Sequence, residues 1–125
     1  MKRDNRPVNL DLTQFSFPLP AITSILHRIT GVILLFGVGF LLWGLDQSLE
    51  SAQSFAALKS LMEGFFPKLI LWGILSALFY HLVAGCKHLL MDMGIGETLE
   101  GGQTGAKVVL AVSVVLILAA GVWVW

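Results

Sequence analysis

The run ITGVILLFGVGFLLWGL, residues 29–45, contains no charged side chain across 17 positions. This length approaches the roughly 20 apolar residues that an α-helix needs to cross a hydrocarbon core of about 30 Å. Two further runs have the same character, because residues 69–86 and residues 108–125 each contain no Asp, Glu, Lys or Arg over 18 positions. The three runs predict an all-α membrane protein with three transmembrane helices.

The composition of the chain supports this prediction. Hydrophobic residues make up 56% of the 125 residues and charged residues 13%, whereas an ordinary soluble domain has roughly 25% charged residues. A chain this short cannot bury so much apolar surface in its own core, so we expect much of it to face lipid. The net charge of zero provides no basic field for nucleic acid. The single cysteine, Cys86, excludes an intrachain disulfide, and we expect it to be a buried apolar thiol.

The spans are expected to extend somewhat beyond the uncharged runs. Pro18 and Pro20 break the chain ahead of the first run, and Thr23 or Ser24 is suited to cap a helix that follows them. We predict a cytoplasmic N-terminal segment at residues 1–20 and a membrane anchor domain at residues 21–125, with spans at about 21–46, 68–91 and 106–125. Since no apolar stretch precedes the prolines, we do not expect a cleaved signal peptide.

The distribution of Lys and Arg predicts the orientation, because cytoplasmic loops carry an excess of these residues. Six of them belong to the N-terminal segment or flank the connection between the second and third spans, which three crossings place on the same side of the membrane: Lys2, Arg3, Arg6, Arg28, Lys87 and Lys107. Only Lys59 and Lys68 lie in the connection between the first two spans. This asymmetry places the N-terminus in the cytoplasm.

The two connections are predicted to differ in structure. In the first, residues 46–68, apolar side chains recur at helical spacing between residues 54 and 66, which is typical of a helix along the outer membrane surface. The second, residues 92–107, contains five glycines and three acidic residues and is predicted to be a cytoplasmic loop.

Polar residues begin the first span. Ser24, His27 and Arg28 lie at positions i, i+3 and i+4, which share one face of a helix, and ionisable groups in or near a span are functional candidates. A hydroxyl, an imidazole and a guanidinium together have the donors to bind a carboxylate and a carbonyl oxygen at the membrane edge. The alternative interpretation is a polar helix start at which Arg28 extends to the lipid headgroups.

His81 lies near the middle of the second span. Gly73, Ala77 and Gly85 share its face at steps of four residues, and Ala84 adds another small residue. A haem needs such a combination, with a nitrogen ligand and no bulky side chain beneath the macrocycle. Close packing of two helices also uses small residues, so a hydrogen-bonded histidine in an ordinary helix interface is the alternative.

His88 follows on the same face, about 10 Å further along the axis at 1.5 Å per residue. His81 and His88 therefore cannot be the two axial ligands of one iron. A second ligand to an iron at His81 must come from His27 or from another chain. Because His27 lies at the predicted cytoplasmic edge and His81 at the centre, we favour another chain.

Three motifs resemble one family. RPVNLDL (residues 6–12), SILHRITGV (24–32) and YHLVAGCKHLLMD (80–92) are similar to the cytochrome b subunit, a membrane anchor, of bacterial succinate dehydrogenase, respiratory complex II. The resemblance covers essentially the whole chain. It implies a heteromeric helical bundle in the bacterial inner membrane, shared with a second membrane anchor subunit, a flavoprotein subunit and an iron–sulfur subunit. FAD and the iron–sulfur clusters would belong to those partners only.

The resemblance implies roles for individual residues. Ser24 and Arg28 match residues that line the ubiquinone pocket, while His27 and Arg28 match groups near the haem propionates. His81 matches the axial ligand of the haem b iron, with the opposite ligand on the second anchor subunit. His88 matches a histidine that is not a principal ligand, and Cys86 and Lys87 receive no role.

The implied function is that of the haem b-binding anchor of a succinate:ubiquinone oxidoreductase, a subunit with no catalytic residue of its own. Electrons from succinate would pass through the partners' flavin and iron–sulfur clusters to ubiquinone. Ser24 would donate to a quinone carbonyl, and Arg28 would stabilise negative charge on the quinone. Two alternatives stay open. One is the anchor of a fumarate reductase, and the other is a non-enzymatic membrane assembly or transport subunit with histidines buried for packing.

Overall fold

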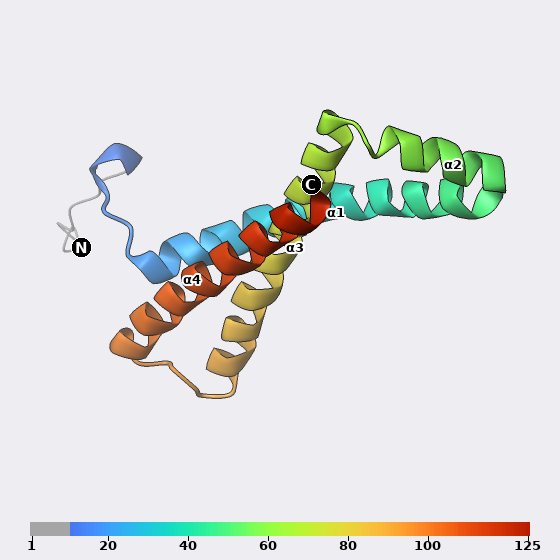
Figure 1. Cartoon of the computed structure of the whole chain (residues 1–125). Coiled ribbons are helices and arrows are strands. Elements are labelled where there is room, and N and C mark those ends of the chain that lie inside the picture. Colours follow the sequence, from blue (N-terminus) through green and yellow to red (C-terminus); the bar gives the residue numbers. More distant parts are fainter. Residues whose placement is uncertain (1–10) are drawn as a thin grey trace, which may run out of the picture.

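The computed structural model describes residues 11–125 (Figure 1), all of whose regular structure is helical. Its elements are the 3₁₀ turn η1 (Leu12–Gln14) and the helices α1 (Leu19–Glu50), α2 (Ala52–Leu61), α3 (Phe65–Asp92) and α4 (Leu99–Val124). Three of these helices, α1, α3 and α4, are long and apolar enough to cross a membrane. This confirms the predicted all-α architecture. The first three basic residues and most of the RPVNLDL motif lie outside the described residues.

The start of α1 is determined by proline. Pro18 is the N-cap in an extended conformation, and Pro20 lies in the first turn, where a missing N–H breaks no helical hydrogen bond. Thr23 lies inside the helix and donates its hydroxyl to the Pro20 carbonyl at 3.0 Å. The prediction that Thr23 or Ser24 caps the helix was therefore wrong. α1 has 32 residues, a length of about 48 Å at the usual helical rise.

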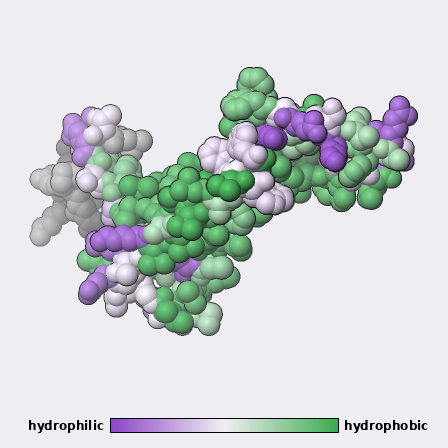
Figure 2. Space-filling view, in the orientation of Figure 1, coloured by the Kyte–Doolittle hydropathy of each residue, from purple (hydrophilic) through white to green (hydrophobic). Residues whose placement is uncertain are grey.

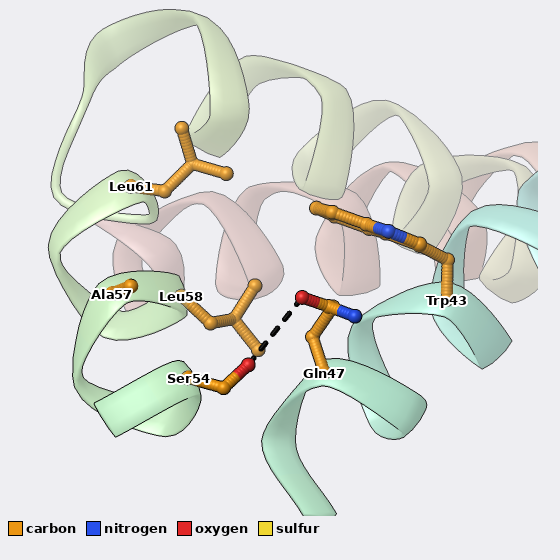
Figure 3. Close-up of a pocket in the computed structure, with 6 residues that line it drawn as sticks. All are labelled: Trp43, Gln47, Ser54, Ala57, Leu58 and Leu61. Atoms are coloured by element: carbon orange, nitrogen blue, oxygen red, sulfur yellow. Dashed lines mark hydrogen bonds between the residues drawn. The ribbon is translucent and has the colours of Figure 1, made fainter. Parts of the chain in front are cut away.

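α2 folds back on the last turns of α1. Ser51 ends α1 and caps α2, where its hydroxyl accepts the backbone N–H of Ser54 at 2.9 Å. The Ser54 hydroxyl in turn lies 3.4 Å from Gln47 Oε1 and links the two helices (Figure 3). The predicted helix at 54–66 ends at Leu61, because residues 62–64 turn the chain and Gly64 caps α3.

A small cavity of about 140 Å³ lies between α1 and α2 (Figure 3). Its lining consists of Trp43, Gln47, Ser54, Ala57, Leu58 and Leu61. None of these side chains is ionisable, and its two most polar groups, Gln47 and Ser54, hydrogen-bond to each other. The cavity belongs to the packing of this hairpin, and we do not consider it a site for chemistry.

α4 packs along α3, and α1 contacts both of them. Residues 93–98 join α3 to α4, with Gly94 and Gly96 at φ values of +83° and +74° that glycine adopts without strain. Thr98 caps α4 and accepts the N–H of Gly101 at 3.0 Å. The predicted loop at 92–107 is therefore much shorter, since its last three glycines belong to α4.

Two long side chains connect α3 to the other spans. The Tyr80 hydroxyl donates to the Thr23 carbonyl of α1 at 2.8 Å. The Trp72 indole N–H donates to the Ile117 carbonyl of α4 at 2.9 Å. Such hydrogen bonds add specificity where helices otherwise meet through apolar and small residues.

Hydrophobic side chains cover most of the face of the molecule that Figure 2 shows. In the most apolar 18-residue stretch of α1, only 6% of the residues are buried, and Leu35 and Phe36 are 73% and 74% exposed. Hydrophilic side chains gather around α2 and near the starts of α1 and α4 (Figure 2). An apolar surface of this extent is stable against lipid or another apolar chain but not against water, as expected of a multi-pass membrane protein.

Candidate functional site

The three histidines of the chain meet between α1 and α3. The ring of His27 stacks on the ring of His81, with centroids 4.0 Å apart and planes inclined by 12°. The ring of His88 lies 5.1 Å from that of His27 at 61°. All three line an open groove of about 380 Å³, together with Leu82, Gly85, Cys86 and Leu89. We call this the histidine groove.

Each helix supplies one histidine and one glycine to this contact. His81 lies over Gly31 of α1, where an added Cβ would be 3.1 Å from the ring's Cε1. His27 lies over Gly85 of α3, where an added Cβ would be 3.3 Å from its Nε2. The absence of side chains at both glycines lets each ring approach the opposite backbone. The sequence signal for this packing is the repeated His-x3-Gly motif, HRITG and HLVAG, which is not apparent when the face of each helix is considered separately.

Two oxygens of α1 hold the His81 ring. Nδ1 of His81 lies 3.0 Å from the His27 carbonyl oxygen and 3.2 Å from Thr30 Oγ1. Because a carbonyl oxygen only accepts hydrogen bonds, Nδ1 carries the proton and donates it. The Nε2 lone pair of His81 is then available for a metal. Thr30 was not a candidate in the sequence, because threonine is ordinary within an apolar helix.

The structure corrects the predicted depths of His27 and His81. His27 was placed at the membrane edge and His81 at the centre, but the two rings are in contact. α1 and α3 therefore bring the two rings to the same level. The stacking nevertheless prevents the two from binding opposite sides of one iron. The nitrogen lone pairs lie in the ring planes, so stacked rings do not direct them toward each other.

The structure adds His88 to the site and corrects the prediction for Cys86. The ring of His88, which received no role as a ligand from the sequence, contacts His27 and lines the histidine groove. Cys86 was predicted to be buried and is exposed, because it lines the open groove instead of the helix interface.

The small residues of α3 serve two different purposes. Ala77 and Ala84, 5% and 1% exposed, are buried in the bundle, as the helix-packing interpretation expected. Gly85 borders the histidine groove, and Gly73 is exposed, with nothing within 4 Å of an added Cβ. The predicted smooth face is therefore open at Gly73 and Gly85 but covered by other helices at Ala77 and Ala84.

Ser24 and Arg28 lie on α1 next to His27, at the spacing that the sequence predicted. Ser24 is partly buried and Arg28 is exposed. Among residues 11–125, neither side chain has a hydrogen bond or ion pair, and neither lines the histidine groove. Their donors are available to a ligand or a partner, but the structure does not join them to the histidines.

Known proteins similar to this chain identify its family. The family model for the succinate dehydrogenase/fumarate reductase transmembrane subunit matches residues 2–120. The succinate dehydrogenase cytochrome b556 subunit of Coxiella burnetii is 45% identical over 121 residues, covering 96% of this chain and 97% of the relative. The cytochrome b556 subunit of Paracoccus denitrificans is 38% identical over 116 residues, covering 93% and 89%. The mitochondrial cytochrome b560 subunit of Sus scrofa is 37% identical over 116 residues, covering 88% and 66%. The chain belongs to the succinate dehydrogenase/fumarate reductase transmembrane subunit family.

Proposed function

We propose that this chain is the haem b-binding membrane anchor of a succinate:ubiquinone oxidoreductase in the bacterial inner membrane. The observation that carries the proposal is the state of His81. Its Nδ1 donates to the His27 carbonyl at 3.0 Å, which leaves the Nε2 lone pair of a groove-lining histidine available to an iron. The relatives' names, cytochrome b subunits of succinate dehydrogenase, support succinate oxidation over fumarate reduction.

The histidine groove fits one side of a haem better than a bare metal ion. A porphyrin supplies four ligands to its iron, so the protein needs only one nitrogen on each face. A bare ion needs several converging ligands, and among residues 11–125 no group of three or more His, Cys, Asp or Glu side chains is placed to hold one. Leu82, Gly85 and Leu89 give the wall beside His81 an apolar character.

The second axial ligand is proposed to come from the second membrane anchor subunit. Within this chain, His27 is stacked against His81 and His88 is about 10 Å further along α3 by the helical rise. Haem b, when bound, accepts and returns one electron. This chain would hold the iron with His81 and offer His27 and Arg28 to the propionates, whose negative charge favours such donors.

Ser24 and Arg28 are proposed to form part of the ubiquinone site at the N-terminal end of α1. The Ser24 hydroxyl would donate to a quinone carbonyl. The Arg28 guanidinium would stabilise the negative charge that develops on the quinone oxygens during reduction. The unused donors of both side chains support this role. Succinate oxidation on FAD and transfer through the iron–sulfur clusters would belong to the flavoprotein and iron–sulfur subunits.

Replacement of His81 tests the haem assignment. In the purified complex, His81→Ala should abolish the low-spin b-type absorption spectrum, because the iron loses an axial nitrogen. His88→Ala removes a histidine from the same helix and groove and should keep that spectrum. An unchanged spectrum in His81→Ala would reject His81 as the ligand.

Replacement of Ser24 and Arg28 tests the quinone site. Arg28→Ala should lower succinate–quinone reductase activity by about 100-fold, the scale of losing one donor to a developing oxyanion, and Ser24→Ala should lower it as well. Both variants should still oxidise succinate with an artificial dye. Lys107→Ala, which removes an exposed basic residue of α4, is the matched control. Full quinone reductase activity in both variants would exclude the two residues from the site.

A further inference from the structure

We infer that Thr30 is a positioning residue for the haem ligand. Its hydroxyl oxygen and the His27 carbonyl together accept the Nδ1 proton of His81 and orient the imidazole. The inference rests on the proposed ligation of haem iron by His81.

The hydrogen bonds of Thr30 determine what its oxygen offers to His81. Thr30 is 9% exposed, and its Oγ1 lies 2.9 Å from the carbonyl oxygens of both Leu26 and His27. Carbonyl oxygens only accept, so the hydroxyl proton is used within α1. Oγ1 therefore presents a lone pair to Nδ1 of His81 at 3.2 Å. The Nδ1 proton is shared between this oxygen and the His27 carbonyl at 3.0 Å.

The two acceptors together restrict rotation of the imidazole. With one acceptor, the ring can turn about its Cβ–Cγ bond and keep an adequate hydrogen bond. A second acceptor on the same helix narrows that range, and the stacked His27 ring limits it further. Thr30 is suited to the task because a β-branched side chain that bonds to its own helix has few rotamers. Its oxygen is thus placed by α1 alone.

The contact also affects the strength of the proposed iron bond. Acceptors on the outer nitrogen of a metal-bound histidine fix its tautomer and raise its basicity as a ligand. A more basic imidazole stabilises ferric iron more than ferrous iron, which lowers the midpoint potential. Removal of one of the two acceptors should therefore raise the potential of the haem.

Thr30→Val is the decisive variant, because it keeps the shape and removes the oxygen. In the purified complex we expect it to retain haem, raise the midpoint potential and shift the EPR g-values that report the orientation of the ligand plane. Thr30→Ser keeps the oxygen and should restore the wild-type potential and g-values. Thr30→Ala, which also lacks the oxygen, should shift both quantities and carries the test if Thr30→Val fails to assemble.

Thr23→Val is the matched control. Thr23 is also a buried threonine of α1, 2% exposed, and donates to the Pro20 carbonyl at 3.0 Å. Its hydroxyl contacts no histidine, so the variant should keep the wild-type potential and g-values. An unchanged potential and spectrum in the oxygen-free Thr30 variants would overturn the inference, and so would an equal shift in Thr23→Val.

His81→Ala, measured in parallel, separates this inference from the proposed function. If His81→Ala keeps the low-spin spectrum, the ligation is wrong and the role of Thr30 falls with it. If His81→Ala loses the spectrum while the oxygen-free Thr30 variants match the wild type, the ligation stands and only the role of Thr30 is overturned.

Discussion

Two residues without side chains decide how the histidines can pack. His81 reaches the α1 backbone only because Gly31 leaves space beneath its ring, and His27 has the same relation to Gly85. Neither histidine would hold its position if a side chain occupied the facing turn. The glycines therefore belong to the histidine groove as much as the rings do, although they carry no chemistry.

Gly31→Ala should weaken haem binding for this reason. The new Cβ would lie 3.1 Å from His81 Cε1, so the ring must move by a few tenths of an ångström and lengthen its hydrogen bond to the His27 carbonyl. We expect a lower ratio of haem to protein in the purified complex, measured from the pyridine haemochrome spectrum. Gly39→Ala is the control, because its Cβ would meet nothing within 4 Å. Equal haem content in the two variants would contradict this account.

The elements of the fold were predictable from the sequence to different degrees. The length of the uncharged runs was sufficient to identify the three long helices, because a helix needs about 20 apolar residues to cross the lipid core. The ends of the helices could not be predicted in this way. The start of α4 depends on a cap at Thr98 and on glycines that composition assigned to a loop. Gly105 is helical and has the Lys87 side chain 3.1 Å from the position of an added Cβ. Composition alone cannot distinguish a glycine that turns the chain from one that admits a neighbour.

The site was predicted only as separate pieces. His81 stood out because an ionisable group in a span needs an explanation. The contacts of His81 with His27 and Thr30 depend on how α1 and α3 are aligned along their axes. The pattern of residues on one helix face does not determine that alignment. The predicted difference in depth between His27 and His81 failed on this point.

The pairing of α3 with α4 depends on Trp72. Its indole N–H donates to the Ile117 carbonyl at 2.9 Å, and its ring packs 5.8 Å from that of Trp125. Trp72→Phe keeps an aromatic ring and removes the donor, so we expect a loss of about 1 kcal/mol, seen as a lower unfolding temperature of the complex. Trp43→Phe is the comparison, because Trp43 is 44% exposed and has no hydrogen bond from its indole among residues 11–125. A larger loss in Trp43→Phe would refute the role of Trp72.

On the face that Figure 2 shows, hydrophilic side chains around α2 are separated by an apolar surface from those near the starts of α1 and α4. Three crossings place α2 and the turn between α3 and α4 on opposite sides of a membrane. The count of six basic residues against two predicts that the α2 side faces outward. Half of the six are in the first ten residues, outside the described part, so the orientation depends on charge and not on the fold.

Labelling of single cysteines tests the orientation. Cys86 is exposed and would react itself, so it is first replaced by Ser. Gln53→Cys places a thiol on an exposed position of α2, and Glu97→Cys places one on the exposed turn before α4. A maleimide that cannot cross the membrane should label Gln53→Cys from the outer side and Glu97→Cys only in inverted vesicles. The reverse pattern would show that the predicted orientation is wrong. Ser24 and Arg28 would then lie on the outer side of the membrane. Only α3 lies between these two positions, so they lie on opposite sides if α3 crosses the membrane. Labelling of both from the same side would therefore contradict the crossing of the membrane by α3.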